Sequence, residues 1–160
     1  MKIKKVKQAY MFFVSLGLVL IGFACEKNDL PPLDDRVLSV LEIQASDCKE
    51  NLKSITVEQS VKLKAVNSTQ LQLEFINGSL NCCPGEIQSS AYIEDQILRV
   101  NFHEEIPGIC NCTCYYDLGC LIDSLENRRY TMEIYVGGDK LDASFSFEYS
   151  KNLEQTIKIN

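Results

Sequence analysis

Seven cysteines between positions 48 and 120 constrain the fold of this chain more than any other feature. A set this dense in a chain of 160 residues is typical of proteins that fold in an oxidising compartment and are stabilised by disulfide bonds. Because the number is odd, the sequence predicts three disulfides and one free thiol. The candidates are Cys48, Cys82, Cys83, Cys110, Cys112, Cys114 and Cys120.

Three of these cysteines form a triplet in which they alternate with other residues: Cys110, Cys112 and Cys114. In an extended strand their side chains would point to one face about 6.6 Å apart, whereas the Cβ atoms of a disulfide lie about 3.5 to 4.5 Å apart. The members of the triplet therefore cannot pair with one another while the segment is extended. Cys82 and Cys83 precede the turn signal Pro84-Gly85, so we expect at least one bridge from this pair to the triplet.

The same thiols have an alternative interpretation as ligands of zinc or copper(I). The alternative metal ligands would be Cys82, Cys83, Cys110, Cys112 and Cys114. Structural zinc sites usually use Cys-x-x-Cys or histidine spacings, which this sequence lacks, and exported thiols tend to form disulfides first. The sequence therefore favours structural disulfides and no cofactor, with a metal-binding or thiol-redox protein as the alternative.

The N-terminal residues 1–24 have the pattern of a secretory signal peptide. Four lysines and no acidic residue in the first seven positions precede an uncharged run that ends at Ala24. A membrane-spanning helix needs roughly 20 apolar residues, and this run is slightly too short. The sequence Ile21-Gly22-Phe23-Ala24-Cys25 resembles the lipobox of bacterial lipoproteins. The resemblance implies cleavage before Cys25 and diacylation of that cysteine, which would anchor the protein to a membrane.

The residues after Cys25 indicate where the anchored protein is expected to reside. Glu26, Lys27, Asn28 and Asp29 are similar to the acidic export signal of Bacteroidetes lipoproteins, and the chain as a whole resembles the small surface lipoproteins of that group. This resemblance implies a cell-envelope protein in the outer membrane, exposed on the cell surface. We expect a lipidated cysteine and flexible linker over residues 25–35 and one domain over residues 36–160.

Removal of the signal peptide changes both size and charge. Loss of 24 residues from 160 leaves 136, which is enough for one domain. The four lysines are lost with no acidic residue, so 12 basic and 22 acidic residues remain, a net charge of −10. Such a surface repels phosphate backbones, so nucleic acid is not an expected partner.

Alternation of apolar and polar residues predicts strands in the remainder of the chain. The clearest are 37–43, 71–76, 97–102, 130–136 and 143–149, and the weaker ones are 54–58, 61–66, 87–93, 112–122 and 155–159. Turn signals lie at Asn77-Gly78, Glu94-Asp95, Pro107-Gly108 and 137–139. Short strands about every ten residues predict an all-β protein, a small antiparallel β-sandwich stapled by disulfides.

One passage resembles a known class of sandwich. Leu118, Cys120 and Ile122 alternate and are expected to face inward, a turn follows at 125–127, and the inward alternation resumes at Tyr130. This order is similar to the strand, corner and tyrosine-bearing strand of immunoglobulin-like and fibronectin type III domains. The resemblance implies an immunoglobulin-like sandwich in which the Tyr130 hydroxyl forms a hydrogen bond back to the preceding chain.

No catalytic motif is apparent in the sequence. His103 is the only histidine and is followed by Glu104 and Glu105, but the chain has no Gly-x-Ser-x-Gly nucleophile motif. His103 is therefore expected at the solvent-exposed end of a strand, and the protein is not expected to be an enzyme.

Two further features concern the surface. Asp123-Ser124-Leu125 matches the short O-glycosylation pattern of Bacteroidetes, which makes Ser124 a candidate modification site. The candidate aromatic residues for a protein- or glycan-binding face are Tyr115, Tyr116 and Tyr135, with Tyr116 expected to face the core and Tyr115 to face away. The predicted function is a lipid-anchored, non-enzymatic envelope protein that acts as an accessory, adhesive or ligand-binding module.

Overall fold

The computed structural model describes residues 31–49, 57–105 and 110–159, and in these ranges the chain forms ten strands and no helix. The strands are β1 Arg36–Leu38, β2 Val40–Ala45, β3 Gln59–Ala65, β4 Leu71–Asn81, β5 Ile87–Glu94, β6 Ile97–Glu104, β7 Thr113–Ile122, β8 Arg129–Val136, β9 Leu141–Glu148 and β10 Glu154–Ile159. The predicted signal peptide, Cys25 and the Pro107-Gly108 turn lie outside the described residues. None of the described residues belongs to a helix long and apolar enough to cross a membrane.

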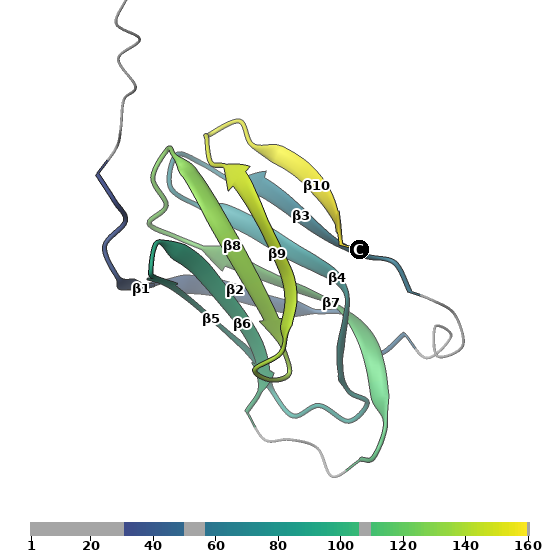
Figure 1. Ribbon diagram of the computed structural model, residues 1–160. Coiled ribbons are helices and arrows are strands. Elements are labelled where there is room, and N and C mark those ends of the chain that lie inside the picture. The colour runs from purple at the N-terminus through teal and green to yellow at the C-terminus, as the bar shows by residue number, and fades with distance from the viewer. Residues whose placement is uncertain (1–30, 50–56, 106–109, 160) are drawn as a thin grey trace, which may run out of the picture.

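The ten strands form two five-stranded sheets that pack face to face (Figure 1). The first sheet has the order β1-β5-β6-β8-β9, and the second has the order β10-β3-β4-β7-β2. The strand pattern along the chain predicted a sandwich without an order of strands, and the prediction of an all-β sandwich stapled by disulfides is confirmed.

One strand pair departs from the antiparallel pattern expected from the sequence. β6 and β8 are parallel, while the other pairs between described strands are antiparallel. The chain leaves the first sheet after β6, runs through β7 in the second sheet, and then returns to pair β8 with β6. A crossover through the opposite sheet makes a parallel pair possible, because parallel strands need a long connection.

The core lies between the sheets and is built from the inward-facing residues of each strand. Leu71, Leu73 and Phe75 of β4 are fully buried, and so are Met132 and Ile134 of β8. The predicted inward alternation in β7 is also present, since its three inward residues are completely inaccessible to solvent: Leu118, Cys120 and Ile122. Burial of these side chains is the main source of stability for the sandwich.

The prediction of a turn at Asn77-Gly78 is wrong, because both residues lie inside β4 at a β-bulge. Asn77 has a φ of 62°, and the register with β7 shifts between Phe75 and Gly78. A Cβ at Gly78 would lie only 2.9 Å from Leu118 Cδ1, which explains the need for glycine. The Asn77 backbone N–H donates to Asp117 Oδ1 at 3.1 Å, so the extra residue of the bulge is held by a side chain.

The turn expected at Glu94-Asp95 is present but shifted by one residue. Asp95 and Gln96 both have positive φ, 51° and 65°, and connect β5 to β6. Two such residues form the tight hairpin turn that matches the twist of the flanking strands.

Two tyrosine hydroxyls secure connections at one end of the sandwich. The Glu126 backbone N–H donates to the Tyr130 hydroxyl at 2.9 Å, which is the backward hydrogen bond expected for this tyrosine. The Tyr149 hydroxyl donates to the carbonyl oxygens of Asn67 and Gln70, at 3.0 and 3.1 Å. Both rings are buried, so each tyrosine joins a surface turn to the core.

Candidate functional site

Six of the seven cysteines form three disulfides, as the sequence predicted. The pairs are Cys48–Cys114, Cys82–Cys112 and Cys83–Cys110, with Cα separations of 5.7, 5.5 and 5.8 Å. Each member of the triplet therefore pairs with a cysteine outside it, and two of the bridges come from the Cys82-Cys83 pair. The remaining candidate, Cys120, is a free thiol.

The strand register explains one of these bridges. β4 and β7 are antiparallel, and their last paired residues are Asn81 and Thr113. Continuation of this register places Cys82 beside Cys112, and the Cys82 backbone N–H donates to the Cys112 carbonyl oxygen at 3.1 Å. The Cys82–Cys112 disulfide therefore extends the β4–β7 ladder beyond its last strand pair, whereas Cys83–Cys110 lies one residue out of that register.

The geometry of these bridges also bears on the alternative metal site. The sulfur atoms of Cys82, Cys83 and Cys110 lie within 4.8 Å of one another, close enough to surround one ion. All three belong to disulfides in this structure. A thiolate metal site would therefore require both bridges to be reduced first.

The free thiol of Cys120 is enclosed in the core. Its side chain is inaccessible to solvent, and burial raises the pKa of the thiol to about 12. A thiol that stays protonated and buried is a poor nucleophile and a poor metal ligand. Cys120 therefore acts as a small core residue on β7.

Of the residues considered for catalysis, His103 and Glu104 line one surface hollow, and Glu105 is not among its lining residues. His103 is exposed at the end of β6, as expected, and Glu105 is exposed beyond it. The Glu104 carboxylate instead accepts a hydrogen bond from the Asn81 backbone N–H at 2.8 Å. Glu104 thus helps to hold β4 beside β6.

The candidate modification site, Ser124, lies at the corner between β7 and β8. Its side chain is exposed and its φ is 69°. The Ser124 backbone N–H donates to the Asp123 carboxylate at 2.6 Å, and this bond lowers the pKa of Asp123. Ser124 is thus presented on a firmly held turn, where O-glycosylation remains a prediction.

The three candidate tyrosines have different surroundings. Tyr116 is buried and its hydroxyl donates to the Asn81 carbonyl oxygen at 3.0 Å, whereas Tyr115 is half-buried and faces away from the core. Both orientations agree with the alternation expected from the sequence. Tyr135 lies on the outer face of the first sheet and lines a surface hollow.

The outer face of the first sheet has a hollow of about 560 Å³, called the first-sheet hollow below. It is lined by Ser90, Tyr92, Arg99, Asn101, Phe102, His103, Tyr135, Gly138 and Asp139. The strand register builds it in rows, because directly paired residues share a face of the sheet. Tyr92 is paired with Arg99 and Arg99 with Glu133, while Asn101 is paired with Tyr135 in the next row.

An ion pair lies in the first of these rows. Arg99 Nε is 3.0 Å from a Glu133 carboxylate oxygen, and Arg99 also contacts Glu94. The Tyr135 hydroxyl donates to Glu133 at 2.8 Å, and this bond, followed by that from Arg99, lowers the pKa of Glu133. The hydrogen bond to Glu133 likewise raises the pKa of Arg99. The Arg99 charge is therefore more than compensated by two carboxylates, and the Tyr135 ring is fixed in orientation.

Other polar groups in the first-sheet hollow have no partner among the residues that the structure describes. The Tyr92 hydroxyl, the Asn101 amide and the His103 imidazole make no hydrogen bond within the described part of the chain. Tyr92 and Asn101 were not singled out from the sequence. The alternation of 87–93 and 97–102 predicted that both residues lie in strands. The sequence alone does not show that these two strands are neighbours.

The known proteins offer no direct guide to the role of this hollow. Its function has to be inferred from the side chains that line it. No protein-family model, curated protein or solved structure matches this chain.

Proposed function

We propose that this protein is a lipid-anchored, non-enzymatic module of the cell envelope that binds a glycan in the first-sheet hollow. The observation that carries the proposal is the grouping of Tyr92, Tyr135 and Asn101 on one outward face, where the Tyr92 hydroxyl and the Asn101 amide make no hydrogen bond to the described part of the chain. Unused polar groups beside aromatic rings are what a polyhydroxylated ligand requires.

The chemistry of the hollow fits a sugar in several respects. Tyrosine rings offer flat apolar area for the C–H face of a pyranose together with a hydroxyl at the edge. The Asn101 amide and the His103 imidazole offer donors and acceptors for sugar hydroxyls. The volume of about 560 Å³ lies within the range of small-ligand sites. Arg99 is neutralised by Glu133 and Glu94, and Asp139 also lines the hollow, so an anionic sugar is disfavoured.

The rest of the chain supports a position in the envelope. The lipobox-like sequence ending at Cys25 would provide the anchor, and residues 26–35 would separate the membrane from β1. Two or three acyl chains hold a protein on a membrane durably. Three disulfides also fit an oxidising compartment outside the cytoplasm.

A glycan array followed by titration calorimetry tests the proposed function. The full chain in detergent should bind at least one neutral oligosaccharide, and Tyr92→Ala or Asn101→Ala should weaken that binding at least tenfold, a loss of about 1.4 kcal/mol. Tyr115→Ala is the matched control, because Tyr115 is a half-buried tyrosine on the second sheet. Equal binding by all variants, or no binding to any glycan, would refute the proposal.

A further inference from the structure

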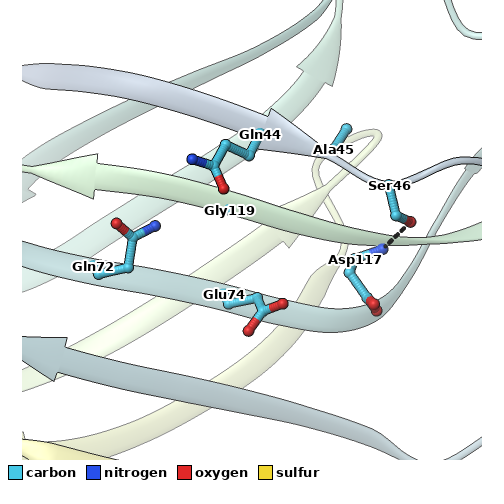
Figure 2. Close-up of a pocket in the computed structure, with 7 residues that line it drawn as sticks. All are labelled: Gln44, Ala45, Ser46, Gln72, Glu74, Asp117 and Gly119. Carbon is cyan, nitrogen blue, oxygen red and sulfur yellow. Dashed lines mark hydrogen bonds between the residues drawn. The ribbon is translucent and has the colours of Figure 1, made fainter.

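The outer face of the second sheet has its own hollow, of about 450 Å³ and open to solvent (Figure 2). It is lined by Gln44, Ala45, Ser46, Gln72, Glu74, Asp117 and Gly119. Its floor is Gly119 of β7, which is paired with Gln44 of β2 on one side and with Glu74 of β4 on the other. We call it the Gly119 hollow. It lies on the sheet opposite the first-sheet hollow.

The hollow exists because position 119 has no side chain. A Cβ built there would lie 3.4 Å from the Leu73 carbonyl oxygen, 3.6 Å from Gln44 Cβ and 3.8 Å from Gln72 Nε2, which are ordinary contact distances. The fold therefore leaves room for a larger residue. Glycine inside a strand weakens the strand and often marks a place where a ligand approaches the backbone closely.

The acidic groups of the Gly119 hollow are already compensated. Lys62 Nζ lies 3.0 Å from the Glu74 carboxylate. Lys49 Nζ lies 2.5 Å from Asp117 Oδ1, which also accepts the backbone N–H of Asn77. These pairs leave no net charge to attract an ion, so the hollow favours a neutral ligand.

The two glutamine amides are the groups that remain for a ligand. Figure 2 shows Gln44 and Gln72 on either side of the Gly119 strand. Neither side chain makes a hydrogen bond within the described ranges. A primary amide both donates and accepts hydrogen bonds, so two of them across a narrow floor match a ligand group that does the same.

We infer that the Gly119 hollow is a second binding site, which takes a neutral sugar unit carrying an acetamido group. The acetamido N–H and C=O pair with the Gln44 and Gln72 amides, and the ring lies over the Gly119 backbone. The inference is independent of the first-sheet hollow.

Saturation-transfer NMR on the full chain in detergent micelles tests this inference, with N-acetylglucosamine as the probe and glucose as the sugar without the acetamido group. Tyr92→Ala and Asn101→Ala are present in every sample, so that the first-sheet hollow does not contribute. We expect transfer to the acetamido methyl group of N-acetylglucosamine and at least tenfold weaker binding of glucose. Gly119→Val should abolish the signal because its side chain fills the hollow, and Gln72→Ala should reduce the affinity several-fold.

Thr156→Val is the matched control, since it places valine on the same sheet at an exposed position of β10. Circular dichroism shows whether each variant folds. If Gly119→Val does not fold, Gly119→Ala is tested in its place. The inference is overturned if Gly119→Val binds as the parent does, if glucose binds equally well, or if the dipeptide glycylglycine binds and N-acetylglucosamine does not. None of these outcomes depends on whether the first-sheet hollow binds a glycan.

Discussion

Replacement of Tyr130 by alanine should lower the free energy of unfolding by about 3 to 5 kcal/mol, the usual cost of removing a large aromatic side chain from a core. The Tyr130 ring is 1 % exposed and stacks on Phe147 with ring centroids 5.7 Å apart. Its loss would leave a cavity beside Phe147 and would also free the Glu126 backbone N–H. Guanidinium denaturation followed by circular dichroism measures the change.

Tyr130→Phe is the control that separates packing from hydrogen bonding. It keeps the ring and removes only the acceptor of the Glu126 N–H, so it should cost about 1 to 3 kcal/mol. If Tyr130→Ala and Tyr130→Phe destabilised the protein equally, packing of the Tyr130 ring would not contribute to stability. A cost below about 1 kcal/mol for alanine would show that the corner is not part of the stable core.

Replacement of both Cys48 and Cys114 by alanine should lower the free energy of unfolding by about 4 kcal/mol in a non-reducing buffer. This bridge joins residues 66 apart, and a loop of that size carries a closure entropy of about this magnitude in the unfolded chain. Such a loss is a large share of the roughly 5 to 15 kcal/mol that stabilises a domain. Thermal and guanidinium unfolding of the double variant measure it.

The matched control is the double replacement of Cys83 and Cys110. Its neighbour, Cys82–Cys112, closes almost the same loop, with a separation of 30 residues against 27. Removal of one of these two bridges should therefore cost well under half of the Cys48–Cys114 effect. The explanation would be contradicted if replacing Cys83 and Cys110 lowered the free energy of unfolding more than replacing Cys48 and Cys114.

Local patterns in the sequence were sufficient for much of the fold. Alternation along β7 and β8 correctly assigned Leu118 and Tyr130 to the core, because a strand exposes its two sides in turn. Strand geometry also excluded bridges within the cysteine triplet, and continuation of the β4–β7 register accounts for Cys82–Cys112.

Other features depend on which strands are neighbours, and sequence alternation does not contain that information. The parallel pairing of β6 with β8 places Asn101 beside Tyr135, which builds the first-sheet hollow. Asn-Gly is a common turn signal, yet Asn77-Gly78 forms a bulge because Asp117 of β7 holds the Asn77 backbone. The Gly119 hollow likewise requires β2 and β4 to flank β7.

The central claim is that the cysteines are structural and that the function lies on the outer faces of the sheets. Intact mass of the domain from residue 26 onward, produced in an oxidising compartment and treated with an alkylating reagent, tests it most directly. We expect no label on the native protein, one label on Cys120 after denaturation without reductant, and seven after reduction. Four or more reactive thiols in the native protein, or a metal that leaves only on denaturation, would contradict the account and make the cysteine cluster the functional centre.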